Sequence, residues 1–173
     1  MSAIRETERF KLPRGGWLEL RPVKPEDDPF LLSVYGSTRD KELSQVQWPE
    51  GQRDAFLRWQ FDLQRKEYDS RFPDARYAVV VVDGEPAGRI WIGSGEKEIR
   101  LLDIAILPQF QNRGAGTLLL KQLIAHAQAE GKALRHMVFV LNDDAHRFYE
   151  RLGFTIIEDL GAYKHMEYPV HGQ

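Results

Sequence analysis

A short glycine-containing segment, Gln111–Thr117 (QNRGAGT), carries the clearest chemical signal in the sequence. It follows an apolar stretch that Pro108 stops, and it precedes a leucine-rich stretch. Gly114 and Gly116 let the backbone turn and approach a ligand without interference from a Cβ atom. Amide groups at the start of a helix bind anionic oxygens, and Arg113 offers charge-assisted contacts to the same anion. The sequence therefore predicts an anion-binding site between a strand and a helix.

The segment differs from the two most common phosphate-binding motifs. The Walker motif needs a longer glycine spacing followed by Lys and then Ser or Thr, whereas no lysine precedes Thr117. The dinucleotide pattern G-x-G-x-x-G is also absent from the sequence. Taken alone, the segment has one alternative interpretation, which is a plain strand-to-helix turn that uses glycine for its sharpness.

A second segment, residues 141–154 (LNDDAHRFYERLGF), weakens that alternative. It places Asn142 after a strand-like stretch, and it places Phe148 and Tyr149 on a short helix-like stretch. Together the two segments resemble the GNAT superfamily of acetyl-CoA-dependent acetyltransferases. The match is close over residues 98–168, and the N-terminal part agrees mainly in the order of its elements. The matching positions are Ile106 and Gln111–Gly116 for the cofactor motif, and Asn142, Ala145, Phe148, Tyr149, Gly153 and Phe154 for the second motif.

The resemblance implies how acetyl-CoA, the expected cosubstrate, is bound. The pyrophosphate is expected on the backbone amides of Gln111, Asn112, Arg113, Gly114, Ala115, Gly116 and Thr117. The strand edge that contains Asp103, Ile104, Ala105 and Ile106 is expected to pair with the pantetheine amides as an added strand would. The other side of the pantetheine, where two strands splay apart, is expected to be lined by Asn142, Phe148 and Tyr149. A helix N-cap is a further role for Asn142, and both roles are compatible.

Tyr149 matches the general acid of the family. In the implied reaction an amine attacks the thioester and expels the CoA thiolate, which a nearby phenol of pKa about 10 can protonate. The alternative is that Tyr149 is only a core aromatic. We assign the packing role to Phe148 and the acid role to Tyr149.

The proton acceptor for the amine is harder to identify. An alkylammonium of pKa about 10.4 is only about one part in a thousand neutral at pH 7, so an acceptor is useful. Asp103 is the first candidate and Glu98 the second, because both lie in or beside the strand where several relatives keep acidic groups. The next strand contains Met137–Val140 and offers no glutamate. An equally open interpretation of Asp103 is a carboxylate satisfied by backbone or by a neighbouring arginine.

The segments with chemistry need a scaffold, and hydrophobic periodicity indicates its elements. Within one predicted helix, Phe56, Trp59 and Leu63 recur at helical spacing and are expected to face the core. The order β-α-α-β-β-β-α-β-α-β-β predicts an α/β (α+β) protein: a mixed, largely antiparallel sheet of about seven strands with helices on both faces. This agrees with the GNAT fold that the resemblance implies. The expected strands are 17–21, 76–82, 88–92, 98–107, 135–141, 154–157 and 162–168. A first helix is expected to begin at residue 25, and three further helices are expected at 51–68, 117–129 and 143–152.

Composition narrows the classes of protein that remain. With 173 residues, we expect a single domain, 1–173. The absence of cysteine excludes a disulfide, a cysteine zinc site and a covalent cysteine thioester. A net charge of −2 gives no basic field for nucleic acid. Because no stretch has the length of a signal peptide or a membrane span, we expect a cytoplasmic protein that binds no membrane. No metal is expected, since the five histidines, 126, 136, 146, 165 and 171, form no ligand pattern.

The predicted function is N-acetyl transfer from acetyl-CoA to a primary amine by direct attack, with no covalent enzyme intermediate. The acceptor is either a small molecule or a peptide, and the chain is a monomer or a homodimer. Two alternatives stay open: a non-catalytic acyl-CoA sensor on the same fold, and a protein N-terminal or lysine acetyltransferase. Residues 37–50, which include Trp48, and residues 161–168 are expected to decide the shape of the acceptor site.

Overall fold

The computed structural model describes residues 9–171, and within them the chain forms an eight-stranded sheet in the order β1-β2-β3-β4-β5-β6-β8-β7. Neighbouring strands are antiparallel except β5 and β6, which are parallel. The predicted mixed, largely antiparallel sheet is confirmed, with one more short strand at its start. The strands are β1 (Arg9–Lys11), β2 (Trp17–Pro22), β3 (Arg76–Val82), β4 (Glu85–Ser94), β5 (Glu98–Ile106), β6 (Ala133–Phe139), β7 (Thr155–Asp159) and β8 (Tyr163–Tyr168).

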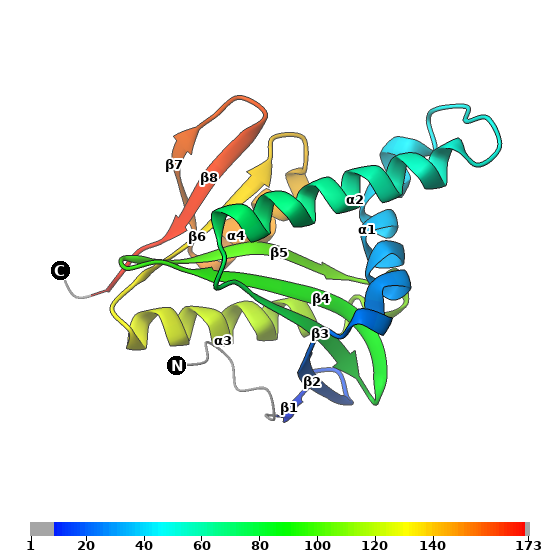
Figure 1. Ribbon diagram of the computed structural model, residues 1–173. Helices are drawn as coiled ribbons and strands as arrows, with labels where there is room; N and C mark the ends of the chain where they lie inside the picture. The colour runs from blue at the N-terminus through cyan, green and yellow to red at the C-terminus, as the bar shows by residue number, and fades with distance from the viewer. Residues whose placement is uncertain (1–8, 172–173) are drawn as a thin grey trace.

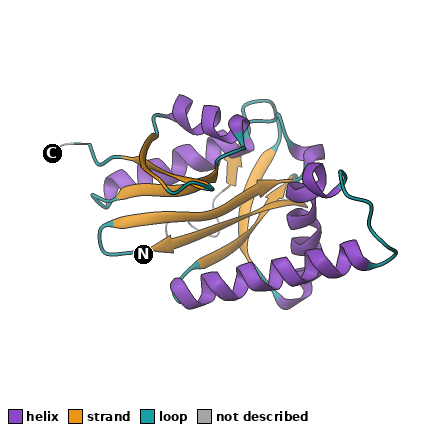
Figure 2. Ribbon diagram, turned by 90° about the horizontal axis from the view of Figure 1, so that it is seen from above, coloured by secondary structure: helices purple, strands orange, loops and turns teal. Residues whose placement is uncertain are grey.

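Four α-helices of the described chain cover the two faces of this sheet (Figures 1 and 2). One face packs against α1 (Asp28–Leu43) and α2 (Gln52–Arg71), and the other against α3 (Ala115–Ala129) and α4 (Asp143–Leu152). Because side chains alternate along a strand, each face has its own core. In β4, for example, Trp91 packs with the α1 and α2 residues, whereas Ile90 and Ile92 pack with those of α3 and α4.

The buried face of α2 differs from the prediction. Leu57 and Phe61 are buried, whereas Trp59 and Leu63 are 59% and 51% exposed. Phe56 is only partly buried. The helix carries apolar residues on two stripes, and the stripe with Phe61 is the one that meets the sheet, 6.4 Å from the ring of Trp91. The predicted face was therefore wrong, because the sequence does not say which stripe meets the sheet.

The sheet opens between its two parallel strands. The pairing of β5 with β6 runs over four positions, from Glu98 opposite Ala133 to Leu101 opposite His136. Beyond this point β5 stays paired with β4, and β6 stays paired with β8, but they no longer pair with each other. Figure 1 shows β6, β7 and β8 rising away from β5. The backbone of 102–106 thus has one side that no strand of the described chain covers.

Candidate functional site

The predicted anion site has the expected backbone. A single 3-10 turn, Pro108–Phe110, follows β5, and α3 begins at Ala115, two residues before the predicted start. Gly114 is the N-cap residue in the left-handed conformation, with φ of 85°, and no side chain caps the helix. Asn112 is also left-handed, with φ of 63°. Since the first amides of a helix have no intrahelical acceptor, their N–H groups are available to an anion.

The two sequence motifs meet at this loop. A Cβ atom added to Gly116 would lie 3.8 Å from Cζ of Phe148, so the start of α3 lies beside α4. A Cβ atom added to Gly114 would lie 3.0 Å from two ring carbons of Pro13. The turn between β1 and β2 therefore packs against the loop on its other side.

Side chains from distant parts of the sequence hold the loop. Arg113 Nη2 donates a hydrogen bond of 2.7 Å to the Gly15 carbonyl and another of 2.8 Å to Asp83 Oδ2. The guanidinium of Arg113 lowers the pKa of Asp83. Arg14 Nη1 donates to the Asn112 carbonyl at 2.9 Å. Nη2 of Arg113 is thus engaged within the protein, while the side chain remains 31% exposed. The predicted contact of Arg113 with an anion stays a prediction.

Tyr149 is buried beside the separated strands. It is 3% exposed, and its ring centroid lies 4.9 Å from that of His136, 5.2 Å from Phe148 and 5.3 Å from Phe154. Burial raises the pKa of Tyr149 above its ordinary value, and the negative charge of Asp103 adds to the increase. The phenol is therefore protonated at neutral pH, as a proton donor must be before the reaction.

Asp103 has the arginine partner that the sequence left open as an alternative. Its Oδ2 lies 2.5 Å from Nη2 of Arg89, a β4 residue that is only 1% exposed. The Arg89 guanidinium also lies 4.2 Å from the ring centroid of Trp91. Asp103, whose side chain is 22% exposed, balances a buried positive charge while remaining accessible. Its role as a proton acceptor stays a prediction.

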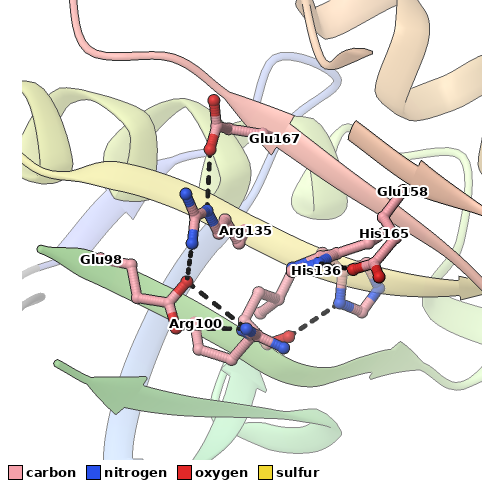
Figure 3. A network of polar contacts seen from close by, with 8 residues as sticks. Glu98, Arg100, Arg135, His136, Glu158, His165 and Glu167 are labelled. Atoms are coloured by element: carbon pink, nitrogen blue, oxygen red, sulfur yellow. Dashed lines mark hydrogen bonds and ion pairs between the residues drawn. The ribbon is translucent and has the colours of Figure 1, made fainter. Parts of the chain in front are cut away.

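Glu98 lies at the other end of β5, where the sheet is still closed. Its carboxylate is 3.1 Å from Arg100 and 3.1 Å from Arg135, and Arg135 continues to Glu167 at 2.7 Å (Figure 3). These pairs cross-link β5, β6 and β8. The structure does not bring Glu98 together with the loop or with Tyr149.

Asn142 has the capping role that its residue type suggested. Its Oδ1 accepts a hydrogen bond of 3.1 Å from the Ala145 amide at the start of α4. The cap holds the helix that carries Phe148 and Tyr149. The predicted contact of Asn142 with pantetheine stays a prediction.

Two residues that were not predicted as site residues contact β5 where it separates from β6. His136 Nδ1 donates to the Leu101 carbonyl at 2.7 Å, and the Tyr68 hydroxyl donates to the Leu102 carbonyl at 3.0 Å. Leu102 is the extra residue of a β-bulge, because Trp91 pairs with Asp103 and Ile92 with Leu101. His136 directly precedes Met137–Val140, the part of the same strand that contains no glutamate, so its position on that strand was the available signal.

Other expected features lie elsewhere. Trp48 donates from Nε1 to the Leu43 carbonyl and borders an open hollow of about 500 Å³, together with Asp40 and Arg53.

Within residues 9–171, no group of three or more His, Asp or Glu side chains is arranged to hold a metal ion. None of the helices in this range has the length and apolar composition needed to cross a membrane.

One family model and several known proteins match this chain. The model of the family described as "Acetyltransferase (GNAT) family" matches residues 38–154, about two thirds of the chain. The chain is 35% identical over 71 residues to the uncharacterized N-acetyltransferase CgeE of Bacillus subtilis, covering 41% of this chain and 27% of that protein. It is 33% identical over 108 residues to the uncharacterized N-acetyltransferase MJ1207 of Methanocaldococcus jannaschii, covering 57% and 45%. These matches span less than half of either relative.

Solved structures show the same fold. An acetyltransferase from Thermus thermophilus aligns with a TM-score of 0.65 and 27% identity, covering 88% of this chain and 97% of that one. The PaiA N-acetyltransferase from Thermoplasma acidophilum, solved in complex with coenzyme A, aligns with a TM-score of 0.67 and 19% identity, covering 88% and 98%. The predicted fold class is therefore confirmed.

Proposed function

The chain belongs to the GNAT family of acetyltransferases, and we propose that it transfers the acetyl group of acetyl-CoA to a primary amine by direct attack. One observation carries this proposal. The uncapped start of α3 lies at the end of β5, and the open side of β5 leads from there towards Tyr149. An anion site, a free strand edge and a proton donor thus follow one another in the order that a thioester of CoA requires.

Acetyl-CoA fits this path in two parts. The pyrophosphate binds to the backbone amides of 111–117, where two left-handed residues and the helix start direct N–H groups outward. The pantetheine pairs with the open side of β5 between Ile106 and Asp103, as an added strand does, and Gln111 Nε2 occupies the Ile106 carbonyl at the loop end of this edge, at 2.8 Å. Phe148 and Asn142 border it from α4. The same fold holds coenzyme A in the Thermoplasma protein.

The reaction then needs one proton at sulfur. The acceptor nitrogen attacks the thioester carbon, the C–N bond forms, and the C–S bond breaks with its electron pair on sulfur. Tyr149 donates its phenolic proton to that thiolate. Because burial keeps the phenol protonated, the donor is in the correct state before each turnover.

Asp103 acts on the acceptor amine. Its carboxylate is fixed by Arg89 on the face that α1 and α2 cover, so a negative charge stands at a defined place near the end of the pantetheine path. A fixed carboxylate attracts an ammonium group and orients it. We therefore assign Asp103 to binding the acceptor amine, and Glu98 has no part in the proposal.

The test is a thiol-release assay with acetyl-CoA and a panel of acceptors: simple amines, polyamines, amino acids, aminoglycosides and peptides with free N-termini. We expect release that depends on the acceptor in at least one class, and that class separates small-molecule from peptide substrates. Binding of CoA in calorimetry with no release for any acceptor would favour the sensor alternative. Absence of both would overturn the proposal.

A further inference from the structure

The side chain of His136 occupies the point where β5 and β6 separate. Leu101 and His136 form the last paired position of the two strands. The imidazole reaches across to β5 and donates from Nδ1 to the Leu101 carbonyl, 2.7 Å away. Figure 3 shows it between the ribbons of β5 and β6. It is therefore the side chain at the closed end of the path proposed for pantetheine.

The hydrogen bond to Leu101 fixes the tautomer of His136. A carbonyl oxygen only accepts, so Nδ1 must carry a hydrogen. In the neutral ring Nε2 then carries the lone pair and is the one atom that can accept a proton. Burial lowers the pKa of His136; the hydrogen bond to Leu101 and the charge of Asp103 oppose this, and the charges of Arg100 and His165 add to it. The neutral imidazole is thus the dominant form at pH 7.

His136 and Tyr149 are ring neighbours. Their centroids lie 4.9 Å apart with the planes tilted by 55°. Tyr149 packs in the core on the α3 and α4 side, together with Leu134 and Val138, which flank His136 at alternating positions of β6. A weak acid and a neutral base therefore stand side by side at one end of the open strand edge.

We propose that His136 is a second catalytic residue, which accepts at Nε2 the proton that the acceptor nitrogen loses and then returns it to Tyr149. This inference rests on the acetyl transfer proposed above. As the C–N bond forms and the C–S bond breaks, sulfur takes the phenolic proton and Nε2 takes the nitrogen proton. The imidazolium then protonates the phenolate. Both residues are regenerated, and one amine proton has in effect moved to the CoA thiol.

The last transfer is favourable in direction. Burial raises the pKa of Tyr149 and lowers that of His136, so a proton shared by the two belongs on the phenol. A buried imidazolium beside a phenolate therefore loses its proton readily. No further acid or base is needed to reset the pair.

The rival explanation is structural, namely that His136 only holds the Leu101 carbonyl. The variant His136→Asn separates the two roles. The asparagine amide can donate from about the position of Nδ1 and so preserve the bond to Leu101, but it has no atom at the position of Nε2. His126→Asn on α3, a histidine paired with Glu130, is the matched control.

We expect His136→Asn to keep its melting temperature and to bind CoA within about twofold of the wild type. Its kcat should fall by about 10² or more, the size of effect typical of a lost general base. After correction for the ionisation of the acceptor amine itself, the wild-type rate should still rise with pH as Nε2 loses its proton, and this additional acidic limb should be absent in His136→Asn. His126→Asn should keep both the rate and the limb.

Wild-type kcat and pH profile in His136→Asn, measured with an acceptor that the wild type acetylates, would overturn the inference and leave the acetyl transfer standing. A wild type inactive with every acceptor would overturn both. Nitrogen-15 NMR of the wild-type histidines with CoA bound gives a readout independent of the variant. A neutral His136 with its proton on Nδ1 is expected, and a proton on Nε2 would overturn the assignment.

Discussion

Arg113 Nη2 lies 2.8 Å from Asp83 Oδ2, which joins the anion loop to the turn between β3 and β4. The same guanidinium holds the Gly15 carbonyl, so two turns that are distant in sequence fix one loop. Both side chains are partly exposed, and an exposed ion pair contributes little free energy of its own. Its value is geometric, because it holds the loop in a binding conformation before the ligand arrives.

The loop backbone makes CoA binding sensitive to a substitution at Gly114. We expect Gly114→Val to raise the CoA dissociation constant at least tenfold, about 1.4 kcal/mol. A left-handed φ disfavours a β-branched residue, and the new Cβ would press on Pro13. Isothermal calorimetry measures the effect. Gly131→Val is the control, since Gly131 is also left-handed but a Cβ atom added to it would meet no atom within 4 Å. Unchanged affinity in a folded Gly114→Val protein would contradict the assignment of the loop.

Tyr149→Phe removes one hydroxyl and keeps the ring contacts. We expect CoA affinity to survive and kcat to fall by about 10², the low end of the range for a general acid. The low end applies because a thiolate with a cysteine-like pKa of about 8.5 already leaves well. KM should change little, since the proton is needed only as charge develops on sulfur. Thiol release at saturating acceptor measures this, with Tyr77→Phe as the control. Full turnover would show that Tyr149 only packs.

Asp103→Asn should have two separate effects, one on KM for the acceptor amine and one on the stability of the fold. We expect KM for the amine to rise about tenfold, and stability in urea to fall by on the order of 2–4 kcal/mol because the buried Arg89 loses its counter-charge. Combining it with Arg89→Met should restore stability but not KM, since no buried charge remains. An amine KM equal to that of the wild type would remove Asp103 from acceptor binding. Loss of the acidic limb of the pH profile would instead make Asp103 the proton acceptor.

The ion pair of Asp27 with Arg21 should make the stability of the fold depend on pH at acidic pH. The hydrogen bond with Arg21 lowers the pKa of Asp27 from 3.8 to about 2. Because the pKa of Asp27 is lower in the folded than in the unfolded chain, ionised Asp27 stabilises the fold fully above about pH 4, and this stabilisation is lost as pH falls through about 2. Asp27→Asn should cost roughly 1–2 kcal/mol at pH 7, and the difference from wild type should shrink towards pH 2. Denaturant unfolding at several pH values measures this. Asp144→Asn, at a side chain 95% exposed, is the control and should show neither effect.

Much of the fold is readable from the sequence because its signals are local. β2 alternates, β3 contains a continuous run of valines ended by an Asp-Gly turn, and Pro108, Gly131 and Gly153 mark the ends of other elements. β1 was missed because three residues are too few to show a period. The buried face of α2 was missed for the opposite reason. The helix has two apolar stripes, and only the sheet decides between Phe61 and Trp59.

The site residues likewise fall into those that the sequence predicts and those that it does not. The anion loop and the aromatic pair on α4 are contiguous motifs, so their residue types and spacing predict them. The partners of Arg113, Asp103 and His136 are not contiguous: they lie between 14 and 98 residues away, on other strands and turns. A side chain that is defined by such a partner has no local signature. This is why the contacts of Arg113 with Gly15 and Asp83 were not predicted, and why His136 was overlooked.

The four paired positions between β5 and β6 also divide the sheet mechanically. Strands β1–β5 form one antiparallel part of the sheet, and β6–β8 form another. Within the described residues, the short seam between β5 and β6 is the only strand pairing that joins the two parts, and the Glu98–Arg135 ion pair reinforces it. A ligand that pairs with the free edge of β5 and touches α4 would lengthen the seam. Under the proposed function, acetyl-CoA therefore also holds the two parts of the sheet together. Its binding should raise the free energy needed to separate them, by about 2.7 kcal/mol when its concentration is one hundred times its dissociation constant.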